Sequence, residues 1–227
     1  MTRLTDSDRM LLQRIMAAGA MDEHQVRRVA KKLTGEELSQ ADVDEMVNNL
    51  AANIRALALD IRRSVYDDGK MYVAVVNTSN DALTQFSSNY KPWEIVFLRK
   101  AIEEIVESED GALHESDLVN LRENTTIGEV KELLRKLVGE KWLAFSPIDR
   151  DQYTLGPRTY LELIAFLRDL EIRKCAICQF EMLQGTPCSS GKASCSTILH
   201  TACLERYEEK GLQYKCPTCK HVIKGSR

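Results

Sequence analysis

The most reactive side chains of this chain are its seven cysteines, which all lie at or after Cys175. Together with one histidine they read Cys175-x2-Cys178-x9-Cys188-x6-Cys195-x4-His200-x2-Cys203-x12-Cys216-x2-Cys219. Two such ligands separated by two residues can bind one metal ion from a single tight turn, and four make a tetrahedral zinc site. The eight ligands therefore predict two structural zinc ions per chain.

The order of the ligand pairs predicts which residues share an ion. In a cross-brace the first and third pairs bind one metal, which assigns Cys175, Cys178, His200 and Cys203 to one zinc and Cys188, Cys195, Cys216 and Cys219 to the other. This interleaving allows about 50 residues to fold with little apolar core, because metal binding supplies folding free energy. Closed sites of this kind hold no reactive water, so the prediction is against zinc hydrolase chemistry, and no thiol is left as a nucleophile.

The other histidines lack this pattern. His221 follows the last cysteine without the paired spacing and is predicted to be a surface residue, and His24 and His114 have no candidate ligands near them. A disulfide framework is not favoured, because the polar start predicts no secretion signal and no apolar run approaches the roughly 18 residues that span a bilayer. We therefore expect an intracellular protein without a membrane segment.

The charge is unevenly distributed along the chain. The net charge is −3, but residues 1–172 carry 22 Lys and Arg against 30 Asp and Glu, whereas residues 173–227 carry 9 against 4. If seven deprotonated cysteines bind two zinc ions there, the positive net charge of the tail becomes smaller. Neither part has the strongly basic balance that is typical of a nucleic-acid-binding domain.

The elements that precede the cysteines are mostly helical. The periodicity predicts a helix from about Asp8 to Ala18 that ends at Gly19, a second helix capped by Asp22, and a long third helix from Ser39 to about Ser64. A β-hairpin then spans Val65–Val76 with Asp68-Gly69 as its turn. This order, in which helices are followed by a β-hairpin, is typical of a winged-helix module.

The same order then repeats after a polar connector at residues 77–92. We expect helices at Trp93–Val106, Glu115–Leu121 and Thr126–Val138, and strands at Trp142–Phe145 and Tyr153–Leu155. A last helix is expected from Gly156 to Leu170. The predicted fold is mainly α with small β-hairpins: tandem winged-helix domains at 1–90 and 91–171, then a two-zinc cross-brace domain at 172–227. A single α+β domain over residues 1–171 is the alternative.

Two zinc loops resemble those of RING domains. These are Cys175-Ala176-Ile177-Cys178, with an apolar residue before the second cysteine, and Cys216-Pro217-Thr218-Cys219. The resemblance implies a RING-type ubiquitin transferase that docks a ubiquitin-conjugating enzyme on Ile177 and Pro217, with Leu204 as a third contact. Such a domain does no covalent chemistry; it positions the ubiquitin thioester for attack by a lysine.

The tail departs from the common RING pattern in two ways. Cys195 is the fourth ligand and His200 the fifth, where three cysteines, one histidine and four cysteines are usual. Lys220 stands where many active RING domains have an arginine that clamps ubiquitin, and the two residues are not equivalent at a bidentate site. The resemblance therefore implies an activity that is weak or requires a partner.

The order of the whole chain is similar to that of the non-SMC element one family, the RING-like subunit of the SMC five–six complex. The resemblance rests on the Asp67-Asp68-Gly69 turn with Tyr72-Val73-Ala74-Val75-Val76-Asn77, on Lys141-Trp142-Leu143, and on the eight-ligand tail. It implies a nuclear, chromosome-associated subunit that acts in DNA repair by homologous recombination. It also implies a MAGE-family partner on which ligase activity depends, and a kleisin subunit.

Three other functions are compatible with parts of the sequence. A PHD-type chromatin reader shares the ligand order, and Tyr214 stands two residues before the seventh ligand, where PHD fingers have an aromatic residue. The zinc domain could instead be a non-catalytic interaction module. Direct DNA binding would use Lys131, Arg135, Lys136 and Lys141, but Glu129 and Glu132 lie among them, so only weak or shared contact is expected.

Overall fold

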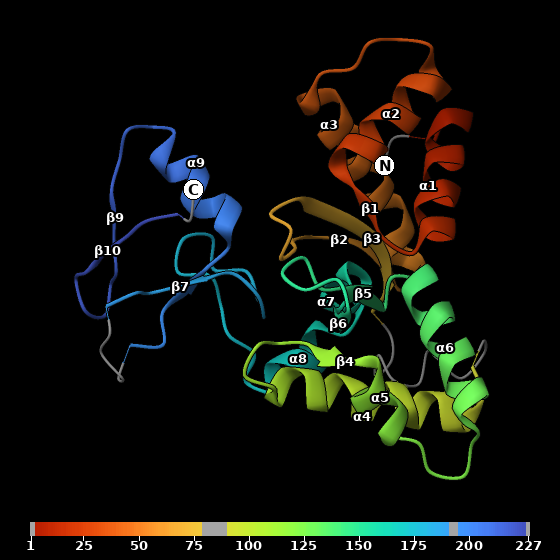
Figure 1. The fold of residues 1–227 in the computed structure, drawn as a ribbon. Coiled ribbons are helices and arrows are strands. Elements are labelled where there is room, and N and C mark those ends of the chain that lie inside the picture. Colours follow the sequence, from red (N-terminus) through yellow and green to blue (C-terminus); the bar gives the residue numbers. More distant parts are fainter. Residues whose placement is uncertain (1–2, 79–89, 191–194, 226–227) are drawn as a thin grey trace.

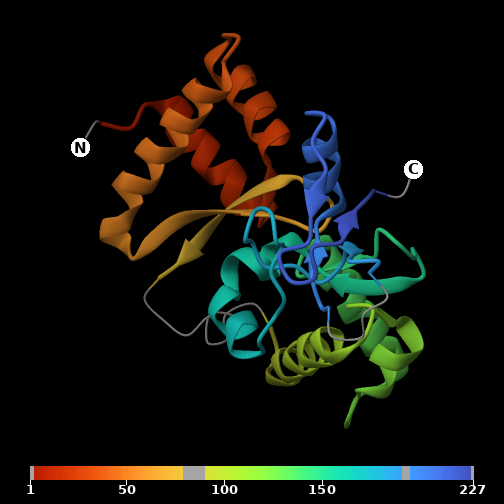
Figure 2. The same cartoon turned by 90° about the vertical axis from the view of Figure 1, so that its left-hand side faces the viewer.

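The computed structural model describes residues 3–78, 90–190 and 195–225. Two helical units, each with a small three-stranded sheet, lie against each other, and the cysteine-rich tail forms a separate lobe beside them (Figure 1). The same arrangement turned by 90° shows the tail lying close to the first unit's hairpin (Figure 2). Most of the predicted connector at residues 77–92 lies outside the described residues, and the predicted domain boundaries stay predictions.

The first unit has its elements in the order α1 (Asp6–Ala18), β1 (Met21–Asp22), α2 (Glu23–Thr34), α3 (Gln40–Ile54), β2 (Leu59–Val65) and β3 (Met71–Asn77). The helix starts follow from local side chains: Thr5, Asp22 and Ser39 each accept a hydrogen bond from a backbone N–H of the first turn. The predicted N-caps Asp22 and Ser39 are therefore confirmed, as is the end of α1 at Gly19.

The predicted length of the third helix is wrong. The helix ends at Ile54, a 3-10 turn follows at Arg55–Leu57, and Ala58 takes a left-handed conformation with φ of 55°. Strand β2 then pairs with β3 over seven residues. Leu57 and Ile61 are four residues apart and fit a helix, but Leu59 and Ile61 also fit a strand, and pairing with β3 selects the second.

The second unit repeats the first. Its elements are α4 (Pro92–Glu107), β4 (Leu113–His114), α5 (Glu115–Asn120), α6 (Ile127–Gly139), β5 (Leu143–Phe145) and β6 (Gln152–Leu155). The strand orders β1-β3-β2 and β4-β6-β5 match, with every pair antiparallel. The predicted order of elements is thus observed, apart from the two-residue strands β1 and β4, which are too short to show a period. The assignment of the units as winged helices stays a prediction.

The last predicted helix is divided in two. Helices α7 (Pro157–Glu162) and α8 (Ile164–Asp169) meet at Leu163, which is buried and has φ of −101° and ψ of 22°. The break turns α8 so that Leu163 and Leu167 both reach the core of the second unit. Helical periodicity continued through Leu163 and gave no sign of the bend.

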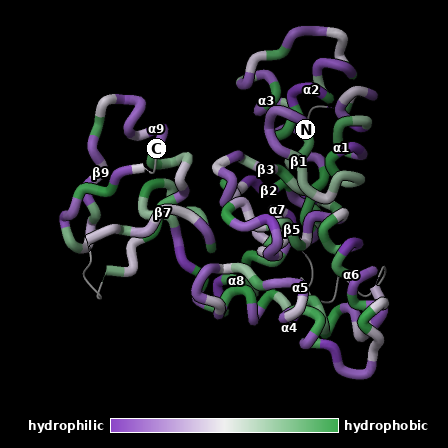
Figure 3. Tube along the Cα trace, in the orientation of Figure 1, coloured by the Kyte–Doolittle hydropathy of each residue, from purple (hydrophilic) through white to green (hydrophobic). Residues whose placement is uncertain are grey.

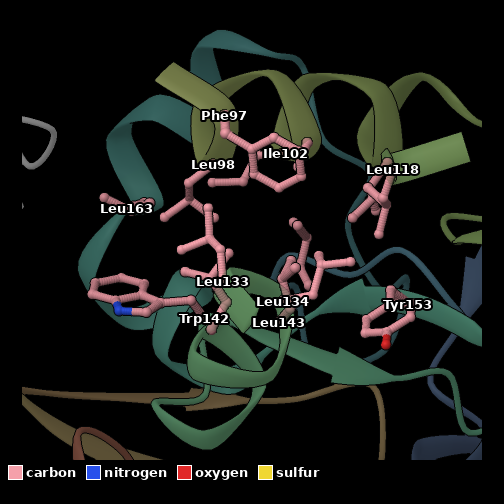
Figure 4. Packing of buried hydrophobic residues seen from close by; sticks show 14 of the residues in the cluster. Phe97, Leu98, Ile102, Leu118, Leu133, Leu134, Trp142, Leu143, Tyr153 and Leu163 are labelled. Atoms are coloured by element: carbon pink, nitrogen blue, oxygen red, sulfur yellow. The ribbon is translucent and has the colours of Figure 1, made fainter. Parts of the chain in front are cut away.

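Each unit has its own apolar core. Along the helices hydrophobic residues alternate with hydrophilic ones (Figure 3), as one-sided burial requires. The larger cluster joins α4, α5, α6 and the second sheet, with Phe97, Leu98, Ile102, Leu118, Leu133, Leu134, Trp142, Leu143, Tyr153 and Leu163 among its members (Figure 4). The smaller cluster joins α1, α2 and α3 to β3 and contains Leu11, Ile15, Val26, Val47, Leu50 and Val73.

The two units are also joined by polar contacts. The Tyr66 hydroxyl donates to the Leu155 carbonyl at 2.8 Å, and the Arg62 guanidinium donates to the Leu161 carbonyl at 3.1 Å. Tyr66 also packs edge-on against Tyr160 with ring centroids 5.6 Å apart. The hairpin of the first unit is therefore held against the end of β6 and against α7.

The cysteine-rich tail has little regular structure. It contains β7 (Thr186–Pro187), β8 (Ile198–Leu199), α9 (Thr201–Glu208), β9 (Tyr214–Lys215) and β10 (Val222–Ile223). Its buried cluster includes three of the metal-ligand candidates, Cys175, Cys203 and Cys216. Among the described residues, no helix combines the length and the apolar character needed to cross a bilayer.

Candidate metal centre

The eight predicted ligands form two clusters. One holds Cys175, Cys178, His200 and Cys203, the other Cys188, Cys195, Cys216 and Cys219, and within each cluster the ligand atoms lie within 4.8 Å of one another. The eight side chains therefore lie in the two groups expected of a cross-brace. Zn–S bonds of about 2.3 Å in a tetrahedron place sulfurs about 3.8 Å apart, so each cluster has room for one zinc ion.

The two Cys-x-x-Cys pairs are built by the same local turn. The N–H of Gln179 donates to the carbonyl of Cys175 at 2.9 Å, and the N–H of Lys220 donates to that of Cys216 at 3.0 Å. Both Gln179 and Lys220 have φ of 64°. This left-handed residue directly after the second cysteine closes the turn, so that both sulfurs of a pair face the same point.

The first cluster is the more deeply buried. His200 is fully buried, and its Nδ1 lies 3.3 Å from Cys178 Sγ and 3.8 Å from Cys203 Sγ. Its backbone N–H approaches Cys175 Sγ at 3.4 Å. The imidazole therefore offers Nδ1 to a metal and turns Nε2 away from the thiols.

The second cluster lies nearer the surface. Sγ–Sγ distances are 3.5 Å from Cys188 to Cys219 and 3.5 Å from Cys195 to Cys216. The Thr197 hydroxyl lies 3.2 Å from Cys216 Sγ. All seven cysteines are free of disulfides. Three sulfurs with one imidazole, and four sulfurs, are the donor sets that closed zinc sites use.

The residues that the RING resemblance points to are unequally placed. Pro217 and Lys220 are exposed, Ile177 is half-buried, and the Lys220 ammonium donates to the Pro217 carbonyl at 3.0 Å. Leu204, predicted as a third docking contact, is 0 % exposed and packs inside the tail. Its burial argues against direct contact with a partner: it lies on the inner face of α9.

Tyr214 is used within the tail. Its hydroxyl donates to the Ala176 carbonyl at 3.1 Å, and its ring meets Tyr207 edge-on. His221 is exposed, as predicted, and so are His24 and His114. None of these three histidines belongs to a cluster of metal-ligand candidates among the described residues.

The basic residues proposed for DNA contact are mostly paired inside the molecule. Lys131 lies 2.6 Å from Glu115, Lys136 lies 3.6 Å from Glu94, and the Lys141 ammonium donates to the Ala20 carbonyl. Burial lowers the pKa of Lys141. Of these four cations, Arg135 is the one for which no such contact is described. Helix α6 and the adjoining Lys141 therefore present little positive charge that is not already paired within the molecule.

Asp67 is a residue that the sequence reasoning treated only as part of a turn. Its neighbour Asp68 plays the turn role, accepting from the Lys70 N–H at 2.9 Å, whereas Asp67 is buried. Burial raises the pKa of Asp67 to about 6, against the opposing effects of the Tyr160 hydroxyl and His200. No sequence pattern separates the two aspartates, because the burial comes from α7 and the tail.

With this geometry established, comparison with known proteins identifies the family. Residues 8–124, more than half of the chain, match the family described as the Nse1 non-SMC component of the SMC5-6 complex. The chain belongs to this family. The matched segment covers the first unit and the start of the second, so the family match is independent of the cysteine-rich tail.

Several relatives match over nearly the whole chain. The rat and human proteins named non-structural maintenance of chromosomes element 1 homolog are each 28% identical to it over 229 residues, covering 95% of this chain and 83% of theirs. The Schizosaccharomyces pombe protein is 26% identical, covering 88% of this chain and 90% of its own. A chain of the solved Nse1-Nse3-Nse4 complex superposes with a TM-score of 0.80 at 27% identity, with all of both chains covered. The family predicted from the sequence is confirmed.

Proposed function

We propose that this chain is the RING-type ubiquitin ligase subunit of an SMC five–six complex, braced by two structural zinc ions. One observation supports this most: two interleaved clusters of cysteine and histidine on a chain of the Nse1 family. Zinc supplies the folding free energy of the tail and takes no part in bond making. The remaining function of such a domain is to present a surface.

That surface is the pair of zinc loops. Ile177 and Pro217 each lie between the two cysteines of a Cys-x-x-Cys pair, and the two pairs have the same turn geometry. The backbone of the candidate ligands therefore fixes the position of both side chains. A ubiquitin-conjugating enzyme bound there has its ubiquitin thioester ordered for attack by a substrate lysine, which is catalysis by positioning.

The partners follow from the family. The solved relative is a chain of an Nse1-Nse3-Nse4 complex. We propose that this chain likewise binds a MAGE-family subunit and a kleisin subunit, acts in the nucleus on chromosomes, and serves DNA repair by homologous recombination. The two repeated units, which we propose to be winged helices, provide the binding surfaces, and any DNA contact is shared with the partners because the α6 cations are largely paired.

The test is single-turnover discharge of ubiquitin from a charged conjugating enzyme, with and without the MAGE-family subunit. Discharge should accelerate only in the presence of the partner, and Ile177→Ala should remove most of that acceleration. Lys220→Arg should increase it, since the guanidinium can form two parallel hydrogen bonds. If the partner gives no acceleration, or if Ile177→Ala has no effect, the ligase proposal is wrong.

A second candidate is a zinc-braced interaction module without ligase activity. It is favoured by the placement of the docking residues: Leu204 is buried, and Lys220 binds the carbonyl of Pro217. In that case the zinc-bound protein assembles with its partners normally and discharges no ubiquitin. A chromatin reader is distinguished by titration with histone-tail peptides, which it binds without discharging a thioester.

A further inference from the structure

Asp67 lies where three parts of the chain meet. It follows β2 at the tip of the first hairpin, and its side chain is 0 % exposed. The Tyr160 hydroxyl at the second unit donates to Oδ2 at 2.9 Å, and the Leu183 N–H of the tail donates to Oδ1 at 3.2 Å. Oδ1 also lies 3.9 Å from Nε2 of His200.

His200 needs an acceptor at that position. Its Nδ1 faces Cys178 and Cys203, so a metal bound at Nδ1 leaves the imidazole proton on Nε2. This Nε2 is buried and has no hydrogen-bond partner among the described residues. A buried donor without an acceptor is costly, and a metal-ligating histidine usually gives its second N–H to a carboxylate or carbonyl.

We propose that Asp67 is the outer carboxylate of the first metal site: it accepts the Nε2–H of His200 and thereby orients the ligand from a different domain. The inference rests on the proposed binding of zinc by the tail. A closure of about 1 Å brings the pair into hydrogen-bond range. Asp67 is a positioning residue, since it acts on the metal only through His200.

The backbone holds the hairpin close enough for this role. Helix α9 begins directly after His200, and the hairpin tip extends toward it (Figure 1). A Cβ built on Gly69 would lie 2.1 Å from the Cβ of Ala202, and the Arg206 guanidinium donates to the Gly69 carbonyl. The hairpin turn is thus in direct contact with the first two turns of α9.

The inference couples the first metal site to the body of the molecule. The second cluster, Cys188, Cys195, Cys216 and Cys219, has no such contact described from residues 3–78. Loss of Asp67 should therefore weaken one site and spare the other. This asymmetry is what a general structural role of Asp67 would not produce.

The first measurement uses the unaltered protein, so it does not depend on any variant folding. Long-range proton–nitrogen NMR of the zinc-loaded chain shows which imidazole nitrogen of His200 carries the proton. We expect a metal-bound Nδ1 and a protonated Nε2 that exchanges slowly with water. A metal-bound Nε2, or an Nε2 proton in rapid exchange, overturns the proposal.

The second measurement compares chelator extraction of the two ions. After exchange with cadmium-113, the three-sulfur, one-nitrogen site and the four-sulfur site give separate NMR signals. Asp67→Ala should speed loss from the first site by roughly 10–100-fold and leave the second unchanged, and Asp67→Asn, which keeps an acceptor oxygen, should lie between. Tyr160→Phe removes another partner of the same carboxylate and is the matched control, expected to change the first site little.

Three results count against the inference. Equal rates in Asp67→Ala and the unaltered protein overturn it, and so does acceleration at both sites. Acceleration by Tyr160→Phe as large as by Asp67→Ala makes Asp67 a packing residue instead. If the unaltered protein holds fewer than two metal ions per chain, the zinc proposal fails first, which is a distinguishable outcome.

Discussion

At the residue scale, the tail offers two imidazoles and the structure uses them differently. His200 is buried with Nδ1 3.3 Å from Cys178 Sγ, whereas His221 is exposed and lies 3.5 Å from the Ser189 hydroxyl. Spacing alone favours His200, because two residues separate it from Cys203, as in the Cys-x-x-Cys pairs. The structure adds that His200 is also the residue at the start of α9, so its backbone is fixed by a helix.

We predict that the His200→Ala and His221→Ala variants differ in the number of zinc ions that each chain binds. His200→Ala removes a ligand from a buried site and should reduce the bound zinc from two equivalents toward one, with a lower unfolding temperature. His221→Ala should keep both ions. Elemental analysis of the purified variants measures this, and a loss of zinc in His221→Ala would show that the ligand assignment is wrong.

At the element scale, the hairpin β2–β3 is held to α9 by a close approach that only glycine allows. Gly69 has φ of +76° and faces Ala202, whereas Gly35 at the end of α2 also has φ of +76° but has nothing within 4 Å of a built Cβ. The two positions therefore have the same backbone requirement and differ in contact. They form a matched pair.

We predict that Gly69→Ala is much more destabilising than Gly35→Ala. The left-handed conformation costs an alanine about 1–2 kcal/mol at either position. At Gly69 the methyl group must also displace Ala202, which separates the hairpin from the tail. Urea unfolding of both variants measures the difference in the free energy of unfolding, and equal losses would mean that the hairpin and α9 do not touch in solution.

Helix α6 gives a second test at this scale. Leu134 on its inner face is fully buried in the second core, while Ile127 in its first turn is 49% exposed. Leu134→Ala should cost about 2–5 kcal/mol, because it leaves a cavity, and Ile127→Ala should cost well under half of that. Thermal unfolding distinguishes them; similar losses would contradict the orientation of α6.

Across the whole molecule, the helical units and the cysteine-rich tail are stabilised in different ways. The units formed by α1–α8 have apolar cores without a cysteine, whereas the smaller buried cluster of the tail includes three candidate ligands, Cys175, Cys203 and Cys216. The tail contributes only α9 to the helices of the described chain. If the proposed zinc ions are bound, the fold of the tail depends on them, whereas the two helical units have apolar cores of their own.

We predict that a strong chelator unfolds the tail and leaves most of the helical signal. The far-ultraviolet circular dichroism should fall only modestly, because α1–α8 lie outside the tail, while protease cleavage should begin between residues 175 and 223. Readdition of zinc should restore protection. If the helical signal collapses together with metal loss, the three parts fold as a single cooperative unit.

Features that depend on neighbouring residues can be predicted from the sequence alone. The candidate ligands follow from the cysteine and histidine spacing, and a turn of five residues closes each of the two Cys-x-x-Cys pairs. The caps at Asp22 and Ser39 and the end of α1 at Gly19 follow from side chains within one turn. The repeated order of helices and strands is local in the same way.

Features that depend on distant residues follow from the packing of the whole chain and not from local patterns. Pairing with β3 converted the end of the predicted third helix into β2, and packing inside the tail buried Leu204. Asp67 and Asp68 are the same residue type in the same turn, yet it is Asp67 whose carboxylate accepts hydrogen bonds from Tyr160 and Leu183, 93 and 116 residues further along the chain. Burial is a property of what packs over a residue, and that is set by chain segments that local patterns do not describe.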